Sequence, residues 1–298
     1  MGYFGNPINF VLVSGVIGLV VLGGAAGGGY PCSDGDGMPK EIFGGVTYGC
    51  ERLAPGRQGK GLVYWVRVDL TAPGIEVYVT PKDPTAVSLG WQYRLRRIRD
   101  VVDKEDLAVA INGTLFSANS GWIKLPGDLA NGAYAAVSDH VVSHVSEDYR
   151  YLLWFDDQLT PHLWQPNQPV VAELPMVKWG ISGPGVPTLI DGVVSPSGRA
   201  IPSNPDSRTA IAIDGPRKLL FLAVGENISP RLILQKLANI GARDGMLLDG
   251  GNSSSMAIGK DAKGVSAGVV TGGWQPVATY FGIRAQRLGS KRLETDTF

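Results

Sequence analysis

The sequence predicts a mixed α/β (α+β) fold, a single domain with a central mixed β-sheet and a few packed helices. Of its 298 residues, 44% are hydrophobic, which is enough to bury a large core. The apolar runs are short and end at glycines or prolines, as strands do, whereas segment 229–241 carries the signals of a helix. No internal repeat occurs, and no linker divides the chain after about residue 40.

The N-terminal end of the chain has the composition of a targeting segment. No charged side chain precedes Asp34, and residues 10–22 are almost wholly apolar. This pattern is typical of a secretory signal, and the uncharged stretch is also long enough to span a bilayer if it is not cleaved. The sequence therefore predicts a signal peptide or membrane anchor over residues 1–30. An N-terminal segment over 31–60, the main domain over 61–286 and a C-terminal tail over 287–298 follow it.

That targeting segment predicts an extracytoplasmic protein, either secreted, periplasmic or attached to a membrane through residues 1–30. The two cysteines, Cys32 and Cys50, agree with such a location, because an oxidising compartment lets them form a disulfide that closes a loop. Two unrelated thiols are the alternative. We expect the disulfide.

The composition excludes several classes of protein. Lysine and arginine total 27 and aspartate and glutamate total 27, so nothing indicates a surface that binds nucleic acid. There are only three histidines, and neither an HExxH motif nor paired CxxC motifs occur. A zinc site built from histidine and cysteine is therefore not expected.

Elements can be assigned in chain order from these patterns. We expect a helix over 91–106, because Leu95, Ile98 and Val102 have helical spacing and arginines at 94, 96, 97 and 99 occupy its solvated face. A second helix begins after Ser229, which can cap it, and ends at Gly241. The expected strands cover residues 61–70, 75–80, 107–111, 209–213, 219–224, 246–248 and 277–285.

The segment 246–256, MLLDGGNSSSM, is the most informative motif. Three apolar residues form a short buried strand, and Asp249 stands where it ends. Gly250 and Gly251 follow and allow the backbone to turn and approach a ligand closely. A carboxylate at a strand end is a frequent way to present a catalytic acid. A polar turn that caps its own backbone is the alternative interpretation.

Polar side chains stand next to strand ends at two further places. Asn112 and Gly113 follow the strand at 107–111, and Arg208 precedes the strand at 209–213. A guanidinium group offers paired donors that match phosphate or carboxylate oxygens. Arg208 therefore indicates an anion site, or else a salt bridge to an acid such as Asp249. An acid, an arginine and several amides or hydroxyls together indicate a hydrolase.

Three motifs resemble those of the phosphodiester glycosidase family. They are INGTLF at 111–116, SRTAIAID at 207–214 and LLDGGNSSSM at 247–256, and the resemblance covers residues 60–285 in consistent order. The chain departs from the family where Thr114-Leu115 replaces Gly-Phe and where Asn252 replaces a third glycine. It also has Val224-Gly225 where the family has an Asp-Gly, and Glu226 is the acid nearest that position.

The resemblance implies a hydrolase that cleaves a sugar-1-phosphodiester at the anomeric carbon and releases free sugar and a phosphomonoester. It implies Asp249 as general base or nucleophile, Arg208 as the phosphate ligand and Glu226 as a second carboxylate. Asp249 is also a possible ligand of a divalent cation, and no other cofactor is expected. The expected substrate-binding residues are Asn112, Gly113, Thr209, Gly250, Gly251, Asn252, Ser253 and Ser254.

The expected partner is a phosphorylated carbohydrate, with cell-envelope or exopolysaccharide glycans as the expected source. Two other functions are compatible with the residues. One is an envelope protein that binds a polysaccharide without cutting it, which the filled glycine positions and the missing acid would suit. The other is a phosphodiesterase that breaks the phosphorus–oxygen bond.

Overall fold

The computed structural model describes residues 32, 38–53, 61–121, 123–143, 151–164, 176–183, 188–195, 204–264 and 266–289. The predicted signal peptide or anchor at 1–30 and most of the predicted C-terminal tail lie outside these residues. Within the described ranges, no helix is both long and apolar enough to cross a bilayer.

The protein is built mainly from antiparallel β-sheets, so the predicted mixed α/β class is wrong. Strands account for 47% of the structure and helices for 12%, and every strand pair among the described residues is antiparallel. The apolar runs predicted strands but not their direction. The largest sheet is covered on both faces, so its strands show the continuous apolar pattern that is otherwise typical of parallel sheets.

The largest sheet has eight strands in the order β1-β2-β3-β17-β16-β18-β14-β15. It contains two of the three motifs, in β16 and in the turn after β18. Its strands are β1 (Lys40–Phe43), β2 (Val46–Arg52), β3 (Leu62–Asp69), β14 (Thr188–Ile190), β15 (Val193–Val194), β16 (Asp206–Asp214), β17 (Leu219–Ile228) and β18 (Asp244–Leu247).

A five-stranded sheet in the order β20-β19-β6-β21-β4 packs against the eight-stranded sheet. It carries the remaining motif, INGTLF, which begins near the end of β6. In this sheet Asn112 pairs with Tyr280, and Ile111 pairs with Met256. The strands are β4 (Glu76–Val79), β6 (Val109–Asn112), β19 (Ser255–Lys260), β20 (Ser266–Gly272) and β21 (Tyr280–Arg284).

Two smaller sheets complete the β-structure. One has five strands in the order β10-β9-β13-β11-β12 and the other has three in the order β5-β8-β7. Their strands are β5 (Tyr93–Arg94), β7 (Phe116–Ala118), β8 (Leu129–Gly132), β9 (Ala136–Ser138), β10 (Val141–Val142), β11 (Leu152–Phe155), β12 (Pro161–Trp164) and β13 (Trp179–Ser182).

The main core lies between the eight-stranded sheet and the five-stranded sheets. Its buried side chains include Ile111 of β6, Leu222 of β17 and Phe281 of β21. Strand β18 contributes to two cores, because Met246 packs in this one and Leu247 packs on the opposite face. The predicted burial of this strand is therefore confirmed, and it holds for both of its faces. All of the other predicted strands also form, although their ends shift.

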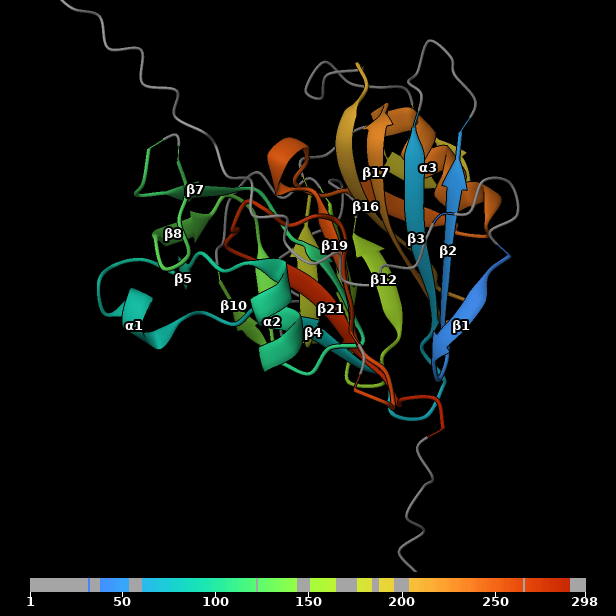
Figure 1. Ribbon diagram of the computed structural model, residues 1–298, viewed down its shortest axis with the longest axis horizontal. Coiled ribbons are helices and arrows are strands. Elements are labelled where there is room, and N and C mark those ends of the chain that lie inside the picture. The colour runs from blue at the N-terminus through green and yellow to red at the C-terminus, as the bar shows by residue number, and fades with distance from the viewer. Residues whose placement is uncertain are drawn as a thin grey trace, which may run out of the picture.

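Helix α3 (Pro230–Asn239) covers the outer face of the eight-stranded sheet, as Figure 1 shows beside β17 and β3. The predicted signals for this helix are confirmed. Its N-cap Ser229 accepts a hydrogen bond from the Leu232 N–H at 3.2 Å. Gly241, just after its end, has a φ of +107°, which a residue with a side chain rarely adopts.

The helix predicted over 91–106 is much shorter. Helix α2 covers only Ile98–Lys104 and packs on the outer face of the β19-β6-β21 layer (Figure 1). The residues before it pair with other strands instead: β5 pairs with β8, and Arg96 forms a bridge with Val277. Arg94 and Arg96 are therefore not on a helix. A further short helix, α1, spans Pro84–Val87.

A disulfide joins Cys32 to Cys50 of β2, with the two α-carbons 5.5 Å apart. It attaches residue 32 to the second strand of the eight-stranded sheet. Without the disulfide the folded protein would be less stable, and β2 would be held only by its antiparallel pairing with β1 and β3.

Candidate active site

One buried amide joins the three sequence motifs. Asn112, the last residue of β6, is fully buried. Its Nδ2 donates to the Asp249 carbonyl oxygen at 2.7 Å. Its Oδ1 accepts from the Thr209 hydroxyl at 2.7 Å and from the Ser255 N–H at 3.0 Å. The side chain is thus bound to protein atoms at both ends, so Asn112 is a positioning residue, and its predicted contact with the substrate stays a prediction.

Gly113 binds the Asp249 backbone and lets Thr279 approach closely. Its carbonyl oxygen accepts from the Asp249 N–H at 3.1 Å, and its own N–H donates to the Thr279 carbonyl oxygen at 2.8 Å. A Cβ at this position would lie 2.4 Å from the Thr279 hydroxyl oxygen, closer than real contacts allow. Only glycine fits here, and the Asn112-Gly113 pair holds Asp249 through both its carbonyl oxygen and its N–H.

The carboxyl group of Asp249 has an unusual proton affinity. Burial raises its pKa from the ordinary 3.8 to about 6, although hydrogen bonds from the Ser253 hydroxyl and the Gly250 N–H and the charge of Lys124 act in the opposite direction. A carboxyl that titrates near neutrality can exchange protons at the pH where most enzymes work. Asp249 therefore has the property that the predicted general base requires.

The turn after Asp249 presents donors around that carboxyl. Gly251–Ser253 form a short 3-10 helix, which begins with Gly251 at a φ of +59°. Ser253 is buried, and its hydroxyl oxygen accepts from the Gln275 side-chain amide at 3.3 Å. Asn252 instead lies exposed on the outside of the turn. Of the predicted ligands in this turn, Ser253 therefore faces the carboxyl and Asn252 faces solvent.

Arg208 places a guanidinium group against the same turn. It is buried, its Nη2 donates to the Asn204 carbonyl oxygen at 3.0 Å, and a Cβ on Gly250 would lie 3.4 Å from its Nη1. Burial lowers its pKa, and the nearby Asp206 partly restores it. The cation that lowers the pKa of Asp249 is Lys124. Arg208 thus lies against the Asp249 turn, and its role as a phosphate ligand stays a prediction.

A comparison with protein-family models decides the family. The model for phosphodiester glycosidases matches residues 105–284, which include all three motifs. The chain belongs to the phosphodiester glycosidase family. The resemblance that the motifs indicated is thereby confirmed.

Solved structures share the fold at low sequence identity. A zebrafish N-acetylglucosamine-1-phosphodiester alpha-N-acetylglucosaminidase catalytic domain, auto-inhibited by its pro-peptide, matches with a TM-score of 0.56 and 13% identity, over 83% of this chain and 87% of that one. A Synechocystis protein matches with a TM-score of 0.57 and 15% identity over 81% of this chain. This chain spans only 62% of the Synechocystis protein's length. A comparison with curated sequences found no match.

Glu226 is linked to the Asp249 turn through a neighbouring strand. Its carboxylate accepts a hydrogen bond from the Thr271 hydroxyl of β20. The next residue, Gly272, packs so closely on the Asp249 turn that an added Cβ would lie 1.9 Å from the Ser254 carbonyl oxygen. Glu226 therefore lies at the same end of the fold as Asp249, and its hydrogen-bond partner there is Thr271.

Sequence reasoning missed Lys124 as a member of the candidate site. It lies in the connection between β7 and β8, with its Nζ 5.8 Å from the centre of the Phe116 ring, and its charge acts on Asp249. Phe116 belongs to the first motif, but no pattern links a single lysine to it. Only the folded chain brings this cation close to Asp249.

Three buried hydroxyls without hydrogen-bond partners surround the end of β18. They belong to Thr114, Ser182 and Ser254, each at most 3% exposed. Thr114 follows Gly113, and Ser182 precedes Gly183, where an added Cβ would lie 1.9 Å from the Leu247 carbonyl oxygen. Leaving a buried hydroxyl unpaired costs about 1–3 kcal/mol. All three lie within the packing around the end of β18.

The described residues contain no cluster of three or more histidine, cysteine, aspartate or glutamate side chains that could hold a metal ion. A cation at Asp249, the predicted alternative, would therefore need hydroxyl, carbonyl or substrate oxygens as its other ligands.

Replacing Asn112 with alanine should destabilise the fold. The change leaves the Thr209 hydroxyl, the Ser255 N–H and the Asp249 carbonyl oxygen without their partner. We expect the free energy of unfolding, measured by urea denaturation, to fall by about 3 kcal/mol. Asn252→Ala, at the exposed position in the turn, serves as the matched control and should change it by less than about 0.5 kcal/mol. Equal effects of the two substitutions would contradict the role of Asn112.

Asp249 should destabilise the folded protein once it is ionised. Its folded pKa of about 6 exceeds its ordinary 3.8, so the folded state binds the proton more tightly. The penalty is therefore absent below the unfolded pKa, grows as the pH rises towards 6 and is complete above it. We expect Asp249→Asn to be about 1–3 kcal/mol more stable than the wild type at pH 8 and to lose this advantage near pH 3.5. Denaturation across that pH range tests this, and a gain independent of pH would refute the assignment.

Proposed function

We propose that this protein hydrolyses a sugar-1-phosphodiester at the anomeric carbon and releases free sugar and a phosphomonoester. The observation that carries the proposal is the Asp249 carboxyl, whose pKa of about 6 is combined with a guanidinium, an ammonium and unpartnered hydroxyls at one strand end. Membership of the phosphodiester glycosidase family supports the reaction class.

Hydrolysis breaks the bond between the anomeric carbon and the phosphate oxygen. In the proposed reaction Asp249 takes a proton from the attacking water, or attacks the anomeric carbon itself and is released by water in a second step. The bonding electrons leave with the phosphate, whose charge Arg208 and Lys124 partly neutralise. A phosphate ester is already a good leaving group, so charge neutralisation outweighs strong protonation in importance here.

Glu226 is proposed as the second carboxylate of the reaction. Its hydrogen bond from Thr271 and the packing of Gly272 on the Ser254 carbonyl support this assignment. In this role Glu226 would exchange a proton with the departing phosphate or with water. The buried hydroxyls of Ser253 and Ser254 would donate to substrate oxygens.

The sugar ring has a proposed contact on the surface beside the turn. Trp274 is 64% exposed, which is unusual for so large an apolar side chain, and its neighbour Gln275 donates to Ser253. Aromatic faces suit the apolar face of a pyranose ring. Stacking on Trp274 would hold a sugar next to the Asp249 turn.

Cell-envelope or exopolysaccharide glycans are the proposed source of the substrate, with the protein in an extracytoplasmic location. The disulfide between Cys32 and Cys50 supports this location, because such bonds persist mainly in oxidising compartments. Attachment to a membrane through residues 1–30 remains part of the proposal and concerns a segment outside the described residues.

Analysis of the products tests the reaction. Incubation with a methyl diester of N-acetylglucosamine-1-phosphate should yield free sugar and methyl phosphate, seen by phosphorus NMR and sugar analysis. We expect Asp249→Asn to lower the rate about a thousandfold while the variant remains folded. Sugar phosphate as the product would indicate a phosphodiesterase, and binding without any product would indicate a polysaccharide-binding protein. A parallel arm with a chelator tests the cation at Asp249.

The pH dependence of the rate tests the role of Asp249. A base must be ionised, so kcat/KM should fall about tenfold per pH unit below an apparent pKa near 6. Lys124 lowers the pKa of Asp249, so in Lys124→Gln the fall of kcat/KM should begin at a higher pH. Lys263→Gln, at an exposed position outside the site, is the matched control and should leave the pH dependence of kcat/KM unchanged. A rate that instead falls as the pH rises through 6 would make Asp249 an acid.

A further inference from the structure

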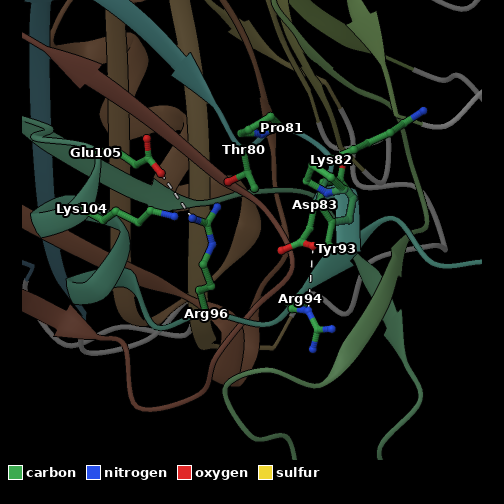
Figure 2. Close-up of a pocket in the computed structure, with 10 residues that line it drawn as sticks. Thr80, Pro81, Lys82, Asp83, Tyr93, Arg94, Arg96, Lys104 and Glu105 are labelled. Carbon is green, nitrogen blue, oxygen red and sulfur yellow. Dashed lines mark hydrogen bonds and ion pairs between the residues drawn. The ribbon is translucent and has the colours of Figure 1, made fainter. Parts of the chain in front are cut away.

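A cavity lies apart from the Asp249 site. It has a volume of about 130 Å³ and lies between the segment that joins β4 to α1 and the C-terminal end of α2 (Figure 2). One water needs only about 10–15 Å³ of such space, so a group of several heavy atoms fits. None of the residues assigned to the Asp249 site lines it. The lining residues are Thr80, Pro81, Lys82, Asp83, Pro84, Tyr93, Arg94, Arg96, Lys104 and Glu105.

Cations outnumber acids in this cavity, and both acids are already engaged. Asp83 caps α1 by accepting from the Ala86 N–H at 2.9 Å, and it lies 3.9 Å from the Arg94 Nε. Glu105 is shared between Arg96 at 3.4 Å and Arg284 at 3.8 Å. Lys82 and Lys104 form no ion pair with any described residue. The cavity therefore has an excess of positive charge.

Hydrogen bonds of its backbone and of its side chain hold Arg96 in place. Its backbone N–H and carbonyl both bond with Val277, at 3.1 and 3.0 Å, and the carbonyl also accepts from the Tyr280 hydroxyl at 2.7 Å. Its Nη1 donates to Glu105 and its Nη2 donates to the Tyr78 hydroxyl at 3.3 Å. A guanidinium has five N–H donors, so three remain for a ligand. This cation is therefore fixed before any ligand binds.

Figure 2 shows Arg96, Lys104 and Thr80 among the residues that line the cavity. An anion in the cavity is attracted by both cations. The Thr80 hydroxyl is buried and bonded to the Tyr280 backbone in both directions, because it accepts from the N–H at 2.9 Å and donates to the carbonyl oxygen at 3.4 Å. The wall of the cavity thus offers an anion a planar fork of donors and a point charge.

We propose that this cavity is a second binding site, which takes the phosphate group of a ligand between Arg96 and Lys104. A guanidinium matches phosphate oxygens with paired donors, and an ammonium adds charge without demanding one geometry. The cavity is large enough for a phosphate and part of what it is attached to. The site is independent of the reaction at Asp249, because neither Arg96 nor Lys104 contacts that carboxyl's turn.

Calorimetric titration with inorganic phosphate tests the site. Lys104→Gln and Arg96→Gln should each weaken phosphate binding about tenfold, the value of one hydrogen bond to a charged group. Arg99→Gln, on the same helix but 71% exposed and outside the cavity, should leave the affinity unchanged. Arg208→Gln should also retain binding at the cavity. Loss of binding in Arg208→Gln alone, or no phosphate binding by the wild type, would overturn the proposal.

Thermal unfolding separates a binding role from a structural one. Arg96→Gln also removes contacts to Glu105 and Tyr78, so Lys104→Gln is the cleaner variant. Without phosphate, we expect the Tm of Lys104→Gln to equal that of the wild type, because no ion pair to a described residue is broken. Phosphate should then raise the Tm of the wild type but not that of the variant. An equal rise in both proteins would refute the site.

Discussion

The buried amide of Asn112 is the interaction on which the rest of the active site depends. It connects β6 to the turn after β18, to β16 and to β19, across 97 to 143 residues of sequence. A primary amide can donate and accept in one plane, and both functions are used here. Because the Asp249 carbonyl is bound by this amide and the Asp249 N–H by Gly113, the peptide groups on both sides of the Asp249 α-carbon are held in place.

The Asp249 carboxyl is desolvated, and hydrogen bonds and a nearby cation moderate the effect on its pKa. Burial dominates the pKa of Asp249, and Ser253, Gly250 and Lys124 only moderate it. Arg208 lies against the same turn, and a Cβ on Gly250 would be in ordinary contact with its Nη1. The balance leaves the acid able to titrate near neutral pH.

Local signals predicted individual elements well and their assembly poorly. The cap of α3 at Ser229 and the buried strand β18 depend on neighbouring residues only, so the sequence is enough to find them. Strand direction depends on which partner each strand meets, and β18 pairs with β16 and β14, far from it along the chain. The first part of the helix expected over 91–106 forms β5 instead, because pairing with β8 stabilises an extended backbone there despite the helical spacing of the apolar residues.

By itself the sequence determined the strands, the capped helix α3, the family and the three motifs, with Asp249 and Arg208 among them. These follow from residue types and short spacings. Only the tertiary structure decided that the sheets are antiparallel, that Asn112 binds protein atoms, that Lys124 acts on Asp249 and that Arg96 and Lys104 share a cavity. Burial, pKa and charge proximity arise from atoms brought together across the whole chain, so no local pattern can encode them.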